Sequence, residues 1–75
     1  SYWMEIRELF AQNLRRHRRA KGLSQEELAY RADIDRTYVS LLERRVYSVS
    51  IDTLAKLANA LEIEPDALLK RPPKK

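Results

Sequence analysis

Apolar side chains recur at helical spacing along most of the chain, and no stretch alternates as a strand would. The first stripe lies between about Glu5 and Lys21 and consists of Ile6, Leu9, Phe10 and Leu14. Gly22 follows directly, at the position where a helix commonly ends in a left-handed residue. The pattern therefore predicts a first helix that turns this stripe toward the core and ends at Gly22.

A second, shorter helix is predicted from Gln25 onward. Ser24 precedes it and Glu27 follows three residues later, which is the capping-box spacing that satisfies two free backbone donors. The apolar residues of this segment share one face and are Leu28, Ala29 and Ala32. We expect this helix to stop near Asp33, so a turn must follow.

A third helix is predicted over about residues 36–44, with Asp35 as its capping residue. Only Val39 and Leu42 point inward in this helix. The opposite side carries Arg36, Thr37, Ser40 and Arg44. A helix with so small an apolar face and so polar an outer face is typical of a helix presented for recognition.

Two further helices are predicted after a loop. Ser50 is placed to cap a helix that runs from Ile51 to about Leu61. The apolar face of that helix consists of Leu54, Leu57, Ala58 and Leu61. Pro65 then opens a short fifth helix at the favoured first helical position, and two leucines are expected to close the core, Leu68 and Leu69.

The predicted fold is all-α, a compact five-helix domain that occupies residues 5–70. Residues 1–4 are interpreted as a flexible N-terminus or as a remnant of cloning, since Met4 can serve as the native start. Residues 71–75 are rich in Pro and Lys and are predicted to form a disordered basic tail.

Three segments together resemble one known family: GLSQEELA, DRTYVSLLERR and IDTLAKLANALEI. They are similar to the phage-repressor/Cro-type helix-turn-helix transcriptional regulators, and the resemblance covers about residues 6–69. It implies a lambda-repressor-like DNA-binding domain. The family usually has Gly where this chain has Asp33, at a position that tends to need a positive φ, which Asp tolerates better than most residues. The segment DRTYVS particularly resembles the controller proteins of restriction-modification systems.

The resemblance implies a sequence-specific regulator of transcription that binds double-stranded DNA. Members of this family bind palindromic operator half-sites as homodimers and place the third helix in the major groove. Two alternatives stay open at this point. One is an antitoxin-type autorepressor, and the other is a helix-turn-helix module that docks onto a partner protein.

The predicted contacts to DNA fall into two groups. Base contacts are expected from Gln25, Arg36, Thr37 and Ser40. Arg36 can donate to guanine O6 and N7 together, whereas Gln25 enters only through the resemblance. Phosphate contacts are expected from Tyr38, Arg44, Arg45 and Tyr47. Tyr38 fits equally well as an aromatic side chain at the edge of the core.

Two further groups of residues have expected structural roles. By the resemblance, Arg18 and Glu43 form an ion pair that links the first helix to the end of the third. Three apolar residues near the third helix are candidates for the dimer interface or for the core: Val46, Val49 and Ile51.

Charge supports DNA binding only through its distribution. The chain has 15 Lys and Arg against 11 Asp and Glu, a formal net charge of +4. Four of these bases lie near the C-terminus, so the remaining 11 bases balance the 11 acids. Residues 15–21 hold a basic run without an acid, which alone is typical of a solvated helix face. Beside a helix-turn-helix, the same run favours contact with nucleic acid.

The composition argues against catalysis. One His and no Cys exclude a Cys–His pair, a disulfide and a multi-histidine metal site, and one Gly excludes a Gly-rich phosphate loop. We therefore predict no enzyme activity, no cofactor, no metal and no small-molecule effector. No apolar run approaches the ~18 residues that cross a membrane, and no signal peptide is visible, so we expect a cytoplasmic, nucleoid-associated protein without a membrane partner.

Overall fold

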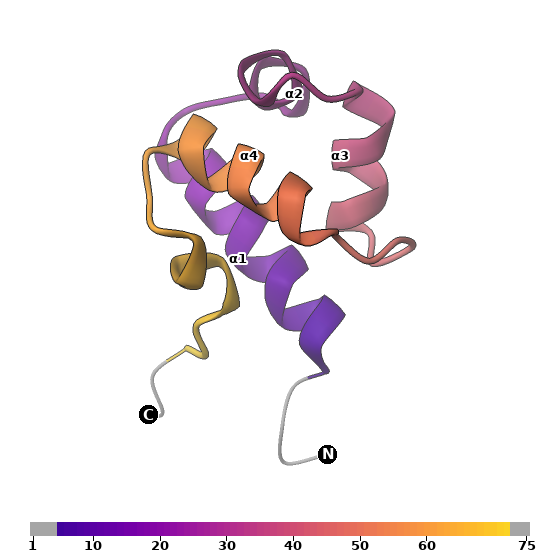
Figure 1. The fold of residues 1–75 in the computed structure, drawn as a ribbon, viewed down its shortest axis with the longest axis vertical. Coiled ribbons are helices and arrows are strands. Elements are labelled where there is room, and N and C mark those ends of the chain that lie inside the picture. The colour runs from indigo at the N-terminus through magenta and orange to yellow at the C-terminus, as the bar shows by residue number, and fades with distance from the viewer. Residues whose placement is uncertain (1–4, 73–75) are drawn as a thin grey trace.

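The computed structural model describes residues 5–72. In this range it contains four α-helices and one 3-10 helix: α1 (Ile6–Ala20), α2 (Gln25–Ala32), α3 (Arg36–Glu43), α4 (Ile51–Leu61) and η1 (Pro65–Leu69) (Figure 1). The predictions of a flexible or cloned N-terminus and of a disordered end at residues 73–75 lie outside the described residues.

The predicted capping residues set the helix boundaries. Ser24 and Glu27 form the capping box of α2, with the Ser24 N–H donating to the Glu27 carboxylate at 2.8 Å and the Glu27 N–H donating to the Ser24 hydroxyl at 3.0 Å. Asp35 caps α3 and Ser50 caps α4 through the same kind of bond. Gly22 follows α1 with a φ of +72°, as predicted. These local signals are confirmed because capping depends on residues only two or three positions apart.

The prediction of a fifth α-helix is wrong, because η1 is a 3-10 helix of five residues. Its proline lacks an N–H, and the segment is too short to build a ladder of α-helical hydrogen bonds. Instead the Ala67 N–H donates to the Glu64 carbonyl at 3.0 Å, three residues back. The fold is therefore all-helical as predicted, with four α-helices and a tighter final turn.

The helices pack around one core. Helix α1 contacts α3 and η1, while α4 contacts α2 and η1. Figure 1 shows α4 crossing in front of α1, with α2 at the top and α3 at the right. Every element contributes at least one completely buried side chain: Leu14, Leu28, Val39, Leu57 and Leu68. The core therefore holds the short helix α3 from behind and leaves its other face open.

Two residues predicted for the core lie at its edge. Ile6 is 53% exposed and Leu69 is 39% exposed. Ile6 is the first residue of α1 and Leu69 is the last residue of η1, so both lie at the end of an element. Both line an apolar cavity that is open to solvent.

Asn13 fastens η1 to α1 and was not predicted as a core residue. It is only 4% exposed, and its amide donates to the carbonyl groups of Leu68 at 3.0 Å and Lys70 at 2.8 Å. Its own oxygen accepts a hydrogen bond from Arg16 at 3.0 Å. A single polar side chain thus joins residues that lie 55 and 57 positions apart in the sequence.

We expect Asn13→Ala to lower the free energy of unfolding by about 1–3 kcal/mol, because it leaves two carbonyl groups without their donor. Chemical denaturation of the variant measures this loss. Asn59→Ala is the matched control, since Asn59 is exposed on α4, and it should change the stability by less than about 0.5 kcal/mol. Equal effects of the two substitutions would show that the Asn13 bonds contribute nothing.

Candidate nucleic-acid interface

Helices α2 and α3 are joined by a tight turn at residues 33–35. Asp33 has a φ of 58°, the left-handed conformation expected where related sequences have Gly. The Asp33 N–H donates to the Tyr30 carbonyl at 3.2 Å, and the Ile34 N–H donates to the Ala29 carbonyl at 3.0 Å. These bonds close the end of α2 and fix the direction in which α3 leaves the turn.

The N-terminal end of α3 presents polar side chains. Arg36 and Thr37 are exposed and Ser40 is partly buried, while Val39 is completely buried against the core. Among residues 5–72, no side chain forms an ion pair or hydrogen bond with the Arg36 guanidinium. The arrangement leaves a planar donor group free at the start of a firmly held helix, which is the geometry that reading of base edges requires.

Gln25 lies apart from these residues. Its amide donates to Glu43 Oε1 at 3.0 Å, so it contacts the last residue of α3 and not the first. An eight-residue helix places its two ends about 10 Å apart. The structure therefore groups Arg36, Thr37 and Ser40 along one helix and places Gln25 at the opposite end.

Arg18 and Glu43 form a buried ion pair between α1 and the end of α3. Arg18 Nε lies 2.7 Å from Glu43 Oε2, and a second guanidinium nitrogen lies 3.1 Å from Oε1. The Glu43 side chain is 0% exposed and the Arg18 side chain is 10% exposed. Arg18 also donates to the Leu23 carbonyl at 2.8 Å. The pair has the bidentate geometry of strong Arg–carboxylate contacts.

Further donors surround the Glu43 carboxylate. Gln25 donates to Oε1, and Arg15 Nε lies 3.4 Å from the same oxygen. Burial raises the pKa of Glu43, but the hydrogen bonds from Arg18, Gln25 and Arg15 together leave that pKa below its ordinary value. Because the carboxylate stays ionised, it holds α1, α2 and α3 together at one point.

The loop after α3 is exposed, and two of its side chains contact residues outside the loop. Arg45 has a φ of 65°, and its guanidinium lies 3.5 Å from Glu8 Oε2 of α1. Tyr38 is partly buried against the core, and its ring centroid lies 6.2 Å from that of Tyr47. Tyr38 therefore lies at the edge of the core, one of the two positions expected from the sequence. Its contact with a phosphate stays a prediction, as do those of Arg44, Arg45 and Tyr47.

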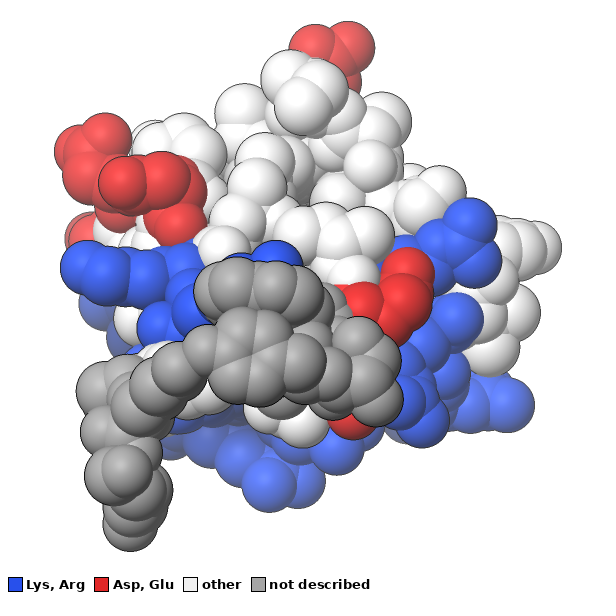
Figure 2. Space-filling model, turned by 90° about the horizontal axis from the view of Figure 1, so that it is seen from below, with Lys and Arg blue, Asp and Glu red and all other residues white. Residues whose placement is uncertain are grey.

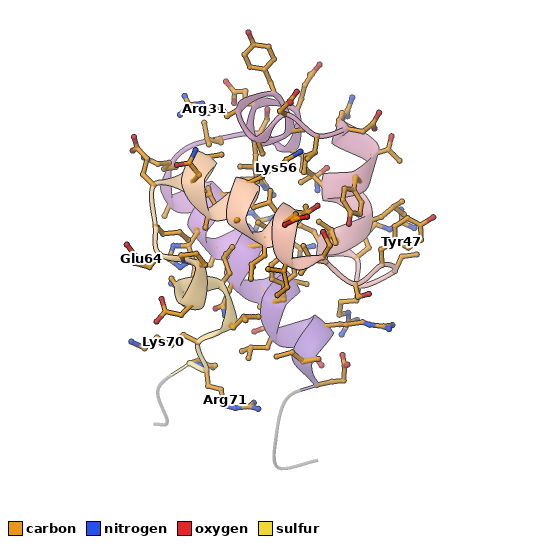
Figure 3. The ribbon with its side chains drawn as sticks, in the orientation of Figure 1. Arg31, Tyr47, Lys56, Glu64, Lys70 and Arg71 are labelled. Atoms are coloured by element: carbon orange, nitrogen blue, oxygen red, sulfur yellow. The ribbon has the colours of Figure 1, made fainter. Side chains whose placement is uncertain are left out.

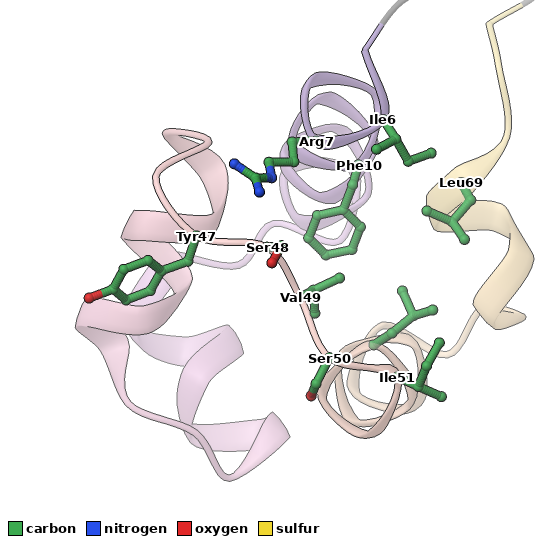
Figure 4. Close-up of a pocket in the computed structure, with 10 residues that line it drawn as sticks. Ile6, Arg7, Phe10, Tyr47, Ser48, Val49, Ser50, Ile51 and Leu69 are labelled. Atoms are coloured by element: carbon green, nitrogen blue, oxygen red, sulfur yellow. The ribbon is translucent and has the colours of Figure 1, made fainter.

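The three candidate interface residues differ in burial. Val46 is 49% exposed and Ile51 is 78% exposed, whereas Val49 is partly buried and packs against the core. Val49 and Ile51 line an apolar cavity of about 180 Å³ together with side chains from both ends of the chain, Ile6, Phe10 and Leu69 (Figure 4). The exposed apolar group is thus larger than the sequence indicated, because α1 and η1 contribute to it.

Charged side chains are unevenly distributed over the surface. In the view of Figure 2, Lys and Arg gather over the lower half, at the left as well as at the right, while uncharged side chains fill most of the upper part. One basic group on α1 consists of Arg15, Arg16 and Arg19. No helix among the described residues is long and apolar enough to span a membrane. Residues 5–72 also contain no cluster of three potential metal ligands.

Three residues with structural contacts were missed in the sequence, Asn13 in the core and Glu8 and Arg15 beside the end of α3. The roles of Asn13 and Glu8 could not be predicted from local sequence patterns, because their partners, Leu68 and Arg45, lie far along the chain. Arg15 belongs to the basic run of α1, but only the fold shows that it reaches Glu43, 28 residues away.

Comparison with known proteins gives consistent results. The family model described as Helix-turn-helix matches residues 14–68. Control protein C.BamHI of Bacillus amyloliquefaciens is 45% identical over 65 residues, which cover 85% of this chain and 80% of that protein. The structure of the hypothetical transcription factor NHTF from Neisseria has a TM-score of 0.88 at 41% identity, covering 91% of this chain and 78% of its own. The structure of the restriction-modification controller protein C.AhdI from Aeromonas hydrophila has a TM-score of 0.81 at 50% identity, covering 83% of this chain and 94% of its own.

Proposed function

Because this chain belongs to the helix-turn-helix family of DNA-binding transcriptional regulators, we propose that it binds palindromic operator half-sites as a homodimer. Helix α3 enters the major groove, where Arg36 and Thr37 meet base edges and Ser40 lies one turn further along. The observation that carries this proposal is the free Arg36 guanidinium at the start of a helix that the core and Glu43 hold in place.

The names of two relatives support a proposal about the regulated genes. Both C.BamHI and C.AhdI are named as control or controller proteins, and the second is named for restriction-modification. We propose that this chain controls a restriction-modification system in the same way. A transcription assay in vitro tests this role. Its template is the promoter region of a restriction-modification system that contains an operator bound by this protein. Absence of any effect on that template would contradict it.

DNA binding itself is tested by selection from a random pool of duplexes. The proposal predicts that the selected sequences contain two inverted half-sites about one helical turn apart, roughly 10 base pairs between centres. A module that docks onto a partner protein would select no common sequence, and its weak binding would be the same on all duplexes.

The dimer is proposed to form through the exposed apolar residues at the start of α4 and the loop before it. Ile51 and Val46 supply exposed apolar surface, and Val49 supports them from the core. A small helix-turn-helix reads few base pairs alone, so a two-fold dimer is needed to cover a full operator. An isologous contact brings the same patch of both copies together and excludes water from it.

We expect Ile51→Glu to weaken dimerisation at least tenfold, which corresponds to about 1.4 kcal/mol, because it places a charge in the apolar contact. Sedimentation equilibrium over a range of protein concentrations measures the change. Asn59→Glu introduces the same charge at the other end of α4 and should leave dimerisation unaltered. If the wild-type protein is a monomer at every concentration, or if both variants behave alike, the proposed interface is wrong.

A further inference from the structure

A second cavity lies on the opposite side of α1 from the apolar one, between α1 and the end of α3. It has a volume of about 430 Å³ and is open to solvent. Three arginines line it, Arg15 from α1 and Arg44 and Arg45 from the loop after α3. The remaining lining residues are Glu8, Ala11, Gln12 and Glu43.

The charges around this cavity do not cancel. Glu43 is completely buried and pairs with both Arg18 and Arg15, so it offsets only part of the positive charge around the cavity. The lining residues hold three arginines against two carboxylates, Glu8 and Glu43, so their formal net charge is 3 − 2 = +1. The buried Arg18 that pairs with Glu43 adds one more positive charge. The result is a concave, net positive surface with an amide, Gln12, at its edge.

Arg15 is held in a defined orientation. Its Nε lies 3.4 Å from Glu43 Oε1, and one terminal nitrogen donates to the Glu43 carbonyl at 3.3 Å. Its side chain is still 43% exposed, and the other terminal nitrogen has no hydrogen-bond partner among residues 5–72. An arginine fixed on one edge and open on the other is prepared to bind an anion without losing much side-chain freedom.

Glu8 forms an ion pair with one of the three arginines. It lies 3.5 Å from the Arg45 guanidinium, and the two side chains are 39% and 54% exposed. An exposed pair at this distance contributes little stability. A phosphate, which offers more acceptor oxygens to the same arginines, can therefore displace it.

We infer that this cavity binds one phosphate group of the DNA backbone, with Arg15 acting beside Arg44 and Arg45, and that Glu8 weakens binding by holding Arg45. The inference rests on the proposed function, since the cavity adjoins the C-terminal end of the helix proposed to enter the major groove. A duplex read by α3 must pass its backbone across that end. Helix α1 thereby takes part in DNA binding, although it lies outside the helix-turn-helix.

The test compares the salt dependence of DNA binding by variants. Arg15→Gln should make the slope of log affinity against log salt shallower by about one unit per half-site, on selected and random duplexes alike. Arg31→Gln removes the same charge on the outer side of α2, away from the loop that carries Tyr47 (Figure 3), and should leave the slope unchanged. Thermal melts of both variants identify any loss caused by unfolding.

Glu8→Gln gives an independent result of opposite sign. Freeing Arg45 should tighten binding to every duplex by about two- to fivefold, the range expected for one exposed ion pair. Tighter binding by Glu8→Gln together with the shallower slope of Arg15→Gln supports the inference. Wild-type slope in a folded Arg15→Gln protein overturns it, even if Glu8→Gln binds more tightly.

Two controls separate this inference from its alternatives. Inorganic phosphate is added to melts of the wild-type protein and Arg15→Gln at constant ionic strength. One outcome is that phosphate stabilises the wild-type protein but not Arg15→Gln, while both proteins have the same salt slope of DNA binding. That outcome would overturn the DNA contact and assign the cavity to free phosphate. If the wild-type protein shows no sequence-selective binding at all, the proposed function fails, and this outcome is distinct because it does not depend on Arg15.

Discussion

Glu43→Leu is expected to lower the free energy of unfolding by about 3–5 kcal/mol, because it leaves the Arg18 guanidinium buried without its counter-charge. Arg18→Met should have a similar effect, since the Glu43 carboxylate is 0% exposed and would lose its principal donor. A chain of 75 residues has a total stability of roughly 4–11 kcal/mol. Either single change therefore removes a large share of the stability.

The double variant Arg18→Met/Glu43→Leu should be much more stable than either single variant, because it removes both charges and fills the site with apolar groups. Denaturant titrations of the four proteins give the coupling free energy directly. Small losses in both single variants would mean that water reaches the pair in solution. That result would contradict the buried geometry and return Arg18 to the possible phosphate contacts.

The same proteins differ in their response to acid. The pKa of Glu43 is lowered in the folded state, so its contribution is present above the ordinary value of 4.5 and is lost as the pH falls through the lowered pKa. The wild-type protein should therefore lose more stability over this acid range than the double variant, which lacks the carboxylate. Parallel acid titrations of both proteins check this sign.

Arg36→Ala should weaken binding to the selected operator by about 1–3 kcal/mol per half-site, and a dimer carries the substitution twice. The loss should be specific, with relaxed preference at one base pair in each half-site, because a bidentate arginine discriminates between bases. Fluorescence anisotropy on duplexes that vary single positions measures both effects. Arg31→Ala is the matched control, since Arg31 is exposed on the outer side of α2, away from the loop that carries Tyr47 (Figure 3). Equal losses on selected and random duplexes would show that Arg36 contacts phosphate only.

The helix boundaries of the chain were predictable because their signals are local. Ser24, Asp35 and Ser50 each cap a helix through atoms two or three residues away, so spacing in the sequence determines them. Asp33 adopts the positive φ that its place in the motif implied. The family resemblance to Cro-type regulators and controller proteins is confirmed by the comparisons.

The remaining features depend on contacts between distant residues. The sequence could not show that Asn13 meets the carbonyl groups of η1, or that Gln25 meets Glu43, 18 residues further on. Periodicity placed Ile6 on the same stripe as Phe10, but it cannot show that, within residues 5–72, the first turn of α1 stays half exposed. The basic cavity needs both α1 and the loop after α3, so neither segment alone indicates it.

The central claim is that α3 reads a DNA sequence, and the ratio of two affinities tests it most directly. Binding is titrated at physiological salt on the selected operator and on a duplex of the same length and composition with its bases shuffled. We expect an affinity at least about 1,000-fold higher for the operator, the lower end of the range for specific recognition. Affinities within about tenfold of each other would mean that the protein contacts only the phosphate backbone, and would contradict the proposed function.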